Sequence, residues 1–341
     1  MRLCSLVLLA CLLVTGGARA GEPAHRPYRI MMLLYRGATE AEQGFRDYFK
    51  RRHIAVDYIV RDAQADRSRI AGFVREARAL QPDLIYTFGT TVTAEVAGLD
   101  GAVDPARHIT TIPIVFDIVA DPVGAGLVRK LSGSGRNLTG ASHLVPLAAQ
   151  LQALQAMRGT QSLGVLYNPQ EKNSALALQE LERLAPRFKL TVHAAPVAAD
   201  SGKQSAVDAI AAAMQSLQQH KVQFIYLPSD SFMIKNARIV VQLAQAAHLP
   251  VFAATEAPIR DDGALLGLVS NYFNVGELAA RKAEQILGGK ADAAGLPIES
   301  LNRYTYLVNM GAARKLHLYP PLSVIKFAEL VAASDSIDAR E

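Results

Sequence analysis

A turn of small and hydroxyl residues follows one buried run of the chain and could bind an anion. Gly89-Thr90-Thr91 comes directly after the apolar run Leu84 to Phe88 and opens a segment with helical spacing. The free N–H groups at the start of a helix favour negative charge, so we expect this turn to bind a carboxylate or another acceptor. Simple N-capping by Thr90 is the structural alternative.

Carboxylate and amide side chains stand at the ends of other apolar runs. Asp117 ends the run that begins at Ile114 and is free to face a cleft, whereas Asp121 before Pro122 is typical of a helix N-cap. Three similar turns follow in the second half: Tyr167-Asn168-Pro169 with Glu171, Asn173 and Ser174; Pro228-Ser229-Asp230-Ser231; and Thr255-Glu256.

Each polar group in these later turns also has a structural interpretation. Asn173, Ser174 and Asp230 stand where a helix cap would stand. Their common position after strands favours binding, because ligands of parallel α/β units bind beyond the carboxyl ends of the strands. For a ligand with a carboxylate and an ammonium group, we expect Gly89 to Thr91 to hold the first and Asp230 the second.

Motifs for covalent or metal chemistry are missing from the sequence. Gly289-Lys290 is followed by alanine and does not form a P-loop, and Gly140-Ala141-Ser142 lacks the second glycine of a nucleophile elbow. The histidines are scattered without metal-ligand spacing. We therefore expect no catalytic residues, no metal and no cofactor.

Strand-like and helix-like segments alternate along the chain in two successive units. Strands are expected at 30–34, 56–60, 84–88, 114–116, 163–167, 190–194, 224–227, 251–253, 265–269 and 304–308, and helices at 40–52, 67–80, 173–184, 204–220, 234–247 and 276–287. A βαβα rhythm predicts parallel sheets covered on both faces. No flexible linker separates the units, which indicates that the chain itself crosses between two domains.

The first twenty residues have the pattern of a secretory signal peptide. Arg2 precedes the apolar run Leu3 to Val14, and Ala18-Arg19-Ala20 has the form of a cleavage site. Both cysteines, Cys4 and Cys11, lie in this leader, so the mature chain would hold no thiol. Because the apolar run continues past Cys11, we expect a periplasmic protein without a lipid anchor or a membrane-inserted segment.

The mature chain is only mildly basic. Removal of Arg2 and Arg19 lowers the formal net charge from +5 to +3. No dense basic cluster interleaves with aromatic residues, so we expect no nucleic-acid partner. About 320 mature residues favour two domains.

Several motifs resemble the ABC-transporter substrate-binding proteins of the tryptophan/tyrosine type. They stand in the order and spacing of that family: Ile114-Val115-Phe116, Asp121 to Val128, Asn137 to Ser142, Val165 to Pro169 with Asn173-Ser174, and Leu227 to Ser231. The resemblance covers nearly the whole mature chain. It implies a type I periplasmic-binding fold, with two Rossmann-like lobes and parallel sheets joined by a three-crossover hinge.

The resemblance also implies a division of the chain and a set of ligand contacts. Lobe 1 would comprise 28–143 with about 271–291, and lobe 2 would comprise 144–270 with about 300–330. The implied contacts are Thr90, Thr91, Ser142, Asn173, Ser174 and Asp230. Two cleft-facing loops depart from the family, Tyr35 to Glu40 and Asn271, which stands where many members have aspartate.

These observations predict a monomeric binding protein that closes around a small polar ligand, such as an amino acid or a related metabolite, and delivers it to the membrane permease of an ABC importer. Two alternatives stay open. A sensor subunit would share every residue named above and differ only in its membrane partner. A two-lobed Rossmann-like enzyme, such as a racemase or a transferase, is the second alternative; racemases of that kind commonly need cysteines, which the mature chain would lack.

Overall fold

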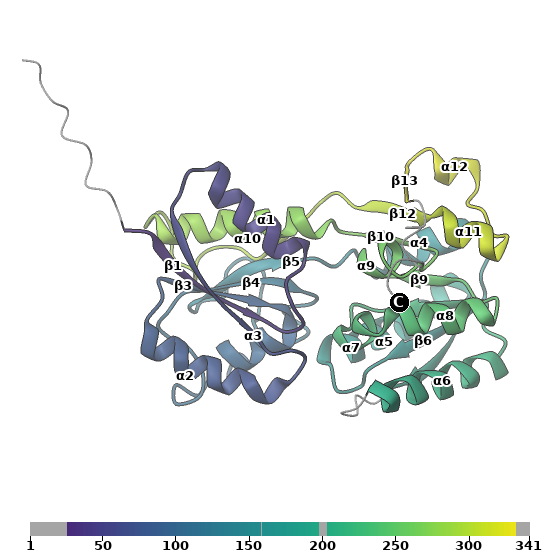
Figure 1. Ribbon diagram of the computed structural model, residues 1–341, viewed down its shortest axis with the longest axis horizontal. Coiled ribbons are helices and arrows are strands. Elements are labelled where there is room, and N and C mark those ends of the chain that lie inside the picture. The colour runs from purple at the N-terminus through teal and green to yellow at the C-terminus, as the bar shows by residue number, and fades with distance from the viewer. Residues whose placement is uncertain (1–25, 158, 198–202, 332–341) are drawn as a thin grey trace, which may run out of the picture.

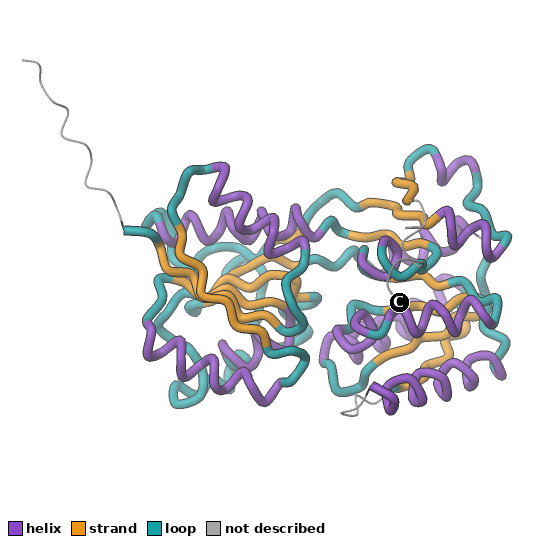
Figure 2. The backbone as a smooth tube through the Cα atoms, viewed as in Figure 1, coloured by secondary structure: helices purple, strands orange, loops and turns teal. Residues whose placement is uncertain are grey.

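Two α/β lobes lie side by side, each with a sheet of strands enclosed by helices (Figures 1 and 2). The computed structural model describes residues 26–157, 159–197 and 203–331. The expected signal peptide, residues 1–20, lies outside these ranges. Within the described ranges no helix combines the length and the apolar character needed to cross a membrane.

The N-terminal lobe contains a six-stranded sheet in the order β11-β5-β4-β3-β1-β2, with every pair parallel. Its strands are β1 (Tyr28–Leu34), β2 (Val56–Asp62), β3 (Leu84–Phe88), β4 (Ile114–Val119), β5 (Leu138–Ser142) and β11 (Glu299–Ser300). Its helices are α1 (Glu40–Arg51), α2 (Ile70–Leu80), α3 (Gly89–Ala97) and α10 (Tyr272–Leu287), with the 3-10 turn η1 (Arg67–Arg69) before α2.

Helices bury both faces of this sheet. In β1, Ile30 and Met32 pack with α1 and α10, whereas Met31 and Leu33 pack with α2 and α3. Both sets are fully buried, so β1 is a continuous apolar run without polar alternation. In Figure 1, α1 and α10 cover the upper face of the lobe and α2 lies below it.

The C-terminal lobe contains a seven-stranded sheet in the order β13-β12-β10-β9-β8-β6-β7. Its strands are β6 (Ser162–Tyr167), β7 (Thr191–Pro196), β8 (Phe224–Leu227), β9 (Val251–Ala253), β10 (Leu266–Val269), β12 (Thr305–Asn309) and β13 (Ala328–Val331). The pairing of β10 with β12 is antiparallel, and the other pairs are parallel.

Helices also enclose the second sheet. They are α4 (Leu147–Met157), α5 (Lys172–Leu184), α6 (Lys203–Gln219), α7 (Ser231–Lys235), α8 (Ala237–Ala246), α9 (Ala257–Arg260), α11 (Met310–Leu316) and α12 (Leu322–Ile325), with the 3-10 turn η2 (Ala185–Phe188) after α5. Side chains of α6 and α8 fill the core on one face, and those of α4, α5 and α11 fill it on the other.

The chain passes between the lobes after β5, after β10 and after β11, because each of these strands is followed by an element of the other lobe (Figure 1). These three connections are the crossovers that join the lobes. The two-lobed α/β fold expected from the sequence is therefore present.

Some local expectations differ from the structure. The helix expected to start at Asp121 is absent: its carboxylate accepts hydrogen bonds from the N–H groups of Val123 and Gly124, but only successive turns follow. Helix α10 starts at Tyr272 and not at Gly276, since Asn271 caps it. Helix α4 was not expected.

Candidate functional site

Each sheet has one point at which the order of its strands reverses, and these two points face each other across the space between the lobes. In the N-terminal lobe, β1 leads to β2 on one side and the chain then continues with β3 on the other side of β1. In the C-terminal lobe β6 has the same relation to β7 and β8. Loops diverge at such a reversal and leave a crevice at the carboxyl ends of the strands, which is where open α/β sheets bind ligands.

One pocket joins the two crevices. It is lined from the N-terminal lobe by Tyr35, Arg36, Phe88, Gly89, Thr90, Thr91, Ile118 and Ala120, from the C-terminal lobe by Asn173, Ser229, Ser231 and Ile234, and by Tyr272 at the second crossover. The free space inside is about 20 Å³, room for a water molecule. A larger solute would therefore enter only if the lobes move apart.

A wider groove continues from this pocket. It has a volume of about 560 Å³ and shares Thr90 and Thr91 with the pocket. Helix α3 and the turn around Gly124 contribute one side, and Gln170 and Lys172 of the C-terminal lobe contribute the other. The groove thus continues the space between the lobes beyond the pocket.

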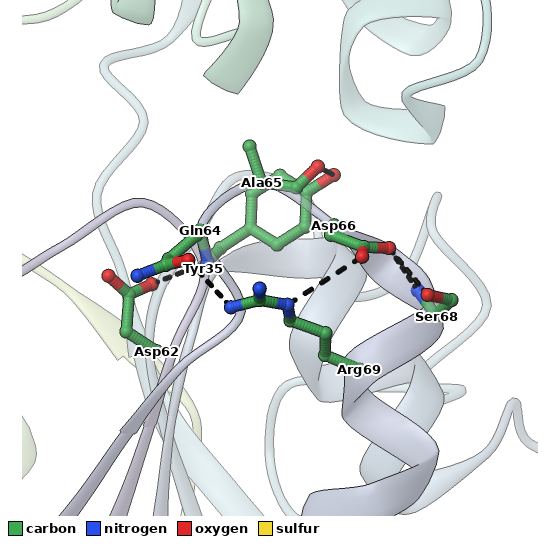
Figure 3. Close-up of polar contacts among 7 residues, drawn as sticks. All are labelled: Tyr35, Asp62, Gln64, Ala65, Asp66, Ser68 and Arg69. Carbon is green, nitrogen blue, oxygen red and sulfur yellow. Dashed lines mark hydrogen bonds and ion pairs between the residues drawn. The ribbon is translucent and has the colours of Figure 1, made fainter. Parts of the chain in front are cut away.

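The loop after β2 supports Tyr35 in the pocket wall (Figure 3). The Tyr35 hydroxyl donates to the carbonyl oxygen of Ala65 at 3.3 Å. Arg69 in turn holds the loop, with its guanidinium 2.6 Å from the Gln64 side-chain oxygen and 3.6 Å from the Asp66 carboxylate. Burial is the main cause that raises the pKa of Tyr35, and the negative charge of Glu171 in the other lobe adds to it.

Helix α3 begins at the pocket wall. Gly89 has a φ of +79°, a conformation that favours glycine, and it turns the chain from β3 directly into the helix. No side chain caps α3, so Thr90 is not an N-cap. Gly89, Thr90 and Thr91, the turn expected to bind an anion, all line the pocket.

A bulge in β4 turns Asp117 away from the pocket. The pairing of β4 with β5 shifts between Phe116 and Val119, and Ile118 takes a φ of +55°, which is rare for a β-branched residue. Ile118 therefore lines the pocket, whereas Asp117 is fully buried beneath it. This differs from the cleft-facing position expected from the sequence.

Asp117 belongs to a buried chain of hydrogen bonds. The Tyr86 hydroxyl lies 2.7 Å from a Glu42 carboxylate oxygen and 3.2 Å from an Asp117 carboxylate oxygen. Burial, followed by the negative charge of Glu42, raises the pKa of Asp117 well above its usual range. Since Tyr86 has one proton and donates it to Glu42, a protonated Asp117 completes the chain by donating to Tyr86.

Asp230 also lies inside its lobe and not in the pocket. Its carboxylate accepts hydrogen bonds from the backbone N–H of Asn168 at 2.7 Å, from the N–H of Met233 at 2.8 Å and from the Ser174 hydroxyl. It caps α7 and is fully buried. The helix-cap alternative therefore describes Asp230, and Ser174 and Asn168 serve the same network.

The other expected site residues divide between the pocket and its supports. Asn173 and Ser229 line the pocket, and the Asn173 side-chain amide donates to the Ser229 carbonyl oxygen. The Ser142 hydroxyl donates to the carbonyl oxygen of Ala120, a pocket residue, at 2.9 Å. Tyr167 packs on the core formed by α4 and α5, and Thr255 is buried.

Contacts at the crossovers connect pocket and hinge. Nε2 of His143 lies 2.8 Å from the Ser229 hydroxyl, and the His143 ring meets the Tyr272 ring edge to face at 5.5 Å. Burial, followed by the positive charge of Arg36, lowers the pKa of His143 to about 3, so its imidazole is neutral at physiological pH. The side-chain oxygen of Asn271 caps α10 by accepting a hydrogen bond from the backbone N–H of Asn274.

Sequence reasoning missed several pocket residues. The pocket residues that were not expected there are Phe88, Ile118, Ala120, Ser231, Ile234 and Tyr272. The loop that holds Tyr35 and Arg36 was expected to face the cleft, because it directly follows the first strand, but neither residue was assigned as a ligand contact. That position becomes a specific signal only when β1 is known to lie at the reversal of strand order.

The fold and the pocket between its lobes define a two-lobed α/β binding protein. Residues 32–332 match the family of ABC transporter substrate binding proteins, and the chain belongs to that family.

Similar proteins match over most of this chain. A tyrosine-binding protein of Clostridioides difficile is 24% identical over 267 residues, which cover 78% of this chain and 71% of that protein. A domain from Streptococcus pneumoniae solved in complex with L-Trp has a TM-score of 0.75 at 24% identity, covering 89% of this chain and 99% of that one. A conserved domain protein of Vibrio cholerae has a TM-score of 0.78 at 23% identity, covering 90% of this chain and 100% of that one.

Proposed function

We propose that this protein captures a small polar solute between its two lobes outside the cytoplasm and delivers it to the membrane permease of an ABC importer. The observation that carries the proposal is the pocket lined by both lobes at their strand-order reversals. A ligand that contacts both walls favours the closed form, because it binds that form more tightly than the open one. The protein acts by binding, as a periplasmic monomer, and no enzymatic role is proposed.

The lobes of the proposed mechanism are residues 28–143 with about 271–291 and residues 144–270 with about 300–330. Closure bends the three crossovers between them, and the occupied, closed form presents a new surface to the permease. The names of two similar proteins, one tyrosine-binding and one solved with L-Trp, support amino acids and related metabolites as the first solutes to test.

Thermal-shift screening of the exported protein against amino acids and other small metabolites tests the proposal, since a ligand that binds only the folded state raises its stability. Small-angle scattering of each hit should show a smaller radius of gyration at saturation. Asn173→Ala should weaken binding of that hit, whereas Asn274→Ala, an exposed residue outside the pocket, should not. A tightly bound solute whose affinity is the same for Asn173→Ala and wild type, and that leaves the radius of gyration unchanged, would contradict a site between the lobes.

A further inference from the structure

Arg36 is a partly buried cation in the pocket wall without a carboxylate partner. It follows β1 at the strand-order reversal, and its Cζ lies 5.4 Å from the centroid of the Phe88 ring. Its Nε is buried without a hydrogen-bond partner, and Arg36 forms no ion pair with another described residue. A buried charge is costly unless a charge of opposite sign accompanies it, so the wall favours an anionic ligand group.

The carboxylates beneath the pocket walls are already bound to other donors. Glu171 accepts the N–H groups of Ser231 and Phe232, both at 2.8 Å, and Asp230 holds its three donors inside the lobe.

Two further carboxyl groups are bound in the same way. Glu256 accepts the N–H of Tyr272 at 2.8 Å and pairs with Arg260 at 3.1 Å, and Asp117 is closed within the Tyr86 network. The pocket lining contains no aspartate and no glutamate. A ligand ammonium group would therefore find no free carboxylate in this wall.

The remaining polar side chains of the pocket are uncharged hydroxyls and one amide, which can donate hydrogen bonds to an anion. Tyr272 is only 8% exposed. Its hydroxyl makes no hydrogen bond of ordinary geometry with the described residues, although the Ser229 side chain lies close enough to influence its pKa. The first residues of α3, whose N–H groups have no side-chain cap, line the same pocket. In the adjoining groove, Arg107 and Lys172 add positive charge, while Glu95 is bound to Arg67 at 2.7 Å.

We propose that the ligand is a carboxylate anion without an ammonium group, held by the guanidinium of Arg36 and the N-terminal amides of α3. This inference rests on the proposed function and narrows its ligand class. The guanidinium presents paired donors to a carboxylate, and Tyr272 supplies a third donor from the crossover. An α-amino acid binds more weakly, because its ammonium group loses water and gains no anionic partner.

Matched probes distinguish the anion from the zwitterion. We would titrate the wild-type protein calorimetrically with L-tyrosine, 3-(4-hydroxyphenyl)propionate and tyramine, and with the corresponding L-leucine, 4-methylpentanoate and isopentylamine. Within each set only the carboxylate and the amino group differ. We expect the anion of at least one set to bind at least tenfold more tightly than its zwitterion, and the amines not to bind.

Variants at Arg36 test the assigned contact. Arg36→Gln should weaken binding of the preferred anion at least tenfold through loss of a charge-assisted bond. The affinity of Arg36→Lys for the same anion should lie between those of Arg36→Gln and wild type. Arg46→Gln is the matched control, because Arg46 also lies over an aromatic ring, with Cζ 5.1 Å from the Tyr58 centroid and a buried, unbonded Nε, but outside the pocket. It should leave the affinity unchanged.

Three results would overturn the inference alone and leave the proposed function standing. They are a zwitterion that binds as tightly as its anion, an Arg36→Gln affinity within twofold of wild type while the variant stays folded, and a screen whose hits between the lobes are all uncharged or cationic. If no solute of the wider screen binds or contracts the protein, the proposed function fails and the inference fails with it.

Discussion

The carboxylate of Glu256, in the C-terminal lobe, accepts a 2.8 Å hydrogen bond from the backbone N–H of Tyr272, where the helix that covers the N-terminal lobe begins. The same carboxylate is 3.3 Å from the side-chain amide of Asn271. One residue of one lobe therefore helps to cap a helix of the other. This connection ties the start of α10, at the second crossover, to the C-terminal lobe.

We expect Glu256→Ala to speed amide hydrogen exchange at Tyr272 at least tenfold, because this N–H loses its acceptor at a helix start. Exchange measured by NMR provides the test. The Val275 amide is the internal control, since it donates to the Asn271 carbonyl oxygen at 3.1 Å and does not depend on Glu256. Equal exchange at Tyr272 in both proteins would contradict the assigned role of Glu256.

We expect Gly276→Ala to lower the free energy of unfolding by about 1–3 kcal/mol, the usual cost of overpacking. Helices α1 and α10 approach so closely that a Cβ at Gly276 would stand 1.9 Å from the Ala41 carbonyl oxygen, and backbone cannot move aside cheaply.

Gly72→Ala provides the matched control for this substitution. Gly72 lies inside α2, and its nearest neighbour to an added Cβ is a flexible arginine nitrogen at 3.8 Å. It should raise the unfolding free energy by about 0.5–1 kcal/mol, since alanine favours helix. Denaturant unfolding measures both variants, and equal effects would refute the close approach.

We expect Asp117→Asn to remove a pH dependence of stability. The pKa of Asp117 is raised in the folded state, so this residue contributes stability below its unfolded pKa, near 3.8, and that contribution is lost as pH rises through the folded pKa. Between these two pKa values, the free energy of unfolding of the variant should therefore rise relative to that of wild type by about 1.4 kcal/mol per pH unit.

Urea unfolding between pH 4 and pH 8 checks this expectation. Asp57→Asn, an exposed position in β2, serves as the control and should keep the wild-type slope. Parallel curves for Asp117→Asn and wild type would mean that Asp117 is ionised in the folded protein.

We expect Asp230→Ala to destabilise the C-terminal lobe by about 2–4 kcal/mol, because two buried N–H groups and the Ser174 hydroxyl lose their acceptor. Ser231→Ala in the same loop should stay within about 0.5 kcal/mol, since its N–H bond to Glu171 is retained. Thermal and denaturant unfolding report both changes. If the Asp230→Ala protein kept wild-type stability but bound the ligand more weakly, Asp230 would instead be a ligand contact.

Local pattern was sufficient for much of the fold. The strands Leu84–Phe88, Phe224–Leu227 and Val251–Ala253 have the bounds expected from the sequence, because short apolar runs ended by polar turns have few other ways to be buried. Helix starts were less predictable: Asn271 caps α10 through a local bond from the N–H of Asn274, but the acceptor of the Tyr272 N–H, Glu256, is supplied only by the fold.

The sequence by itself determined the alternation of strand and helix, the repetition of that unit and the polar turns at the strand ends, since these follow from hydrophobic period and turn chemistry between neighbouring residues. Tertiary structure decided which polar groups reach the pocket. A one-residue bulge in β4 directs Asp117 inward and Ile118 outward, and helix capping occupies Asp230. The position of Arg36 likewise depends on strand order, because only pairing between distant strands brings the loop after β1 beside the start of α3 and opposite the second lobe.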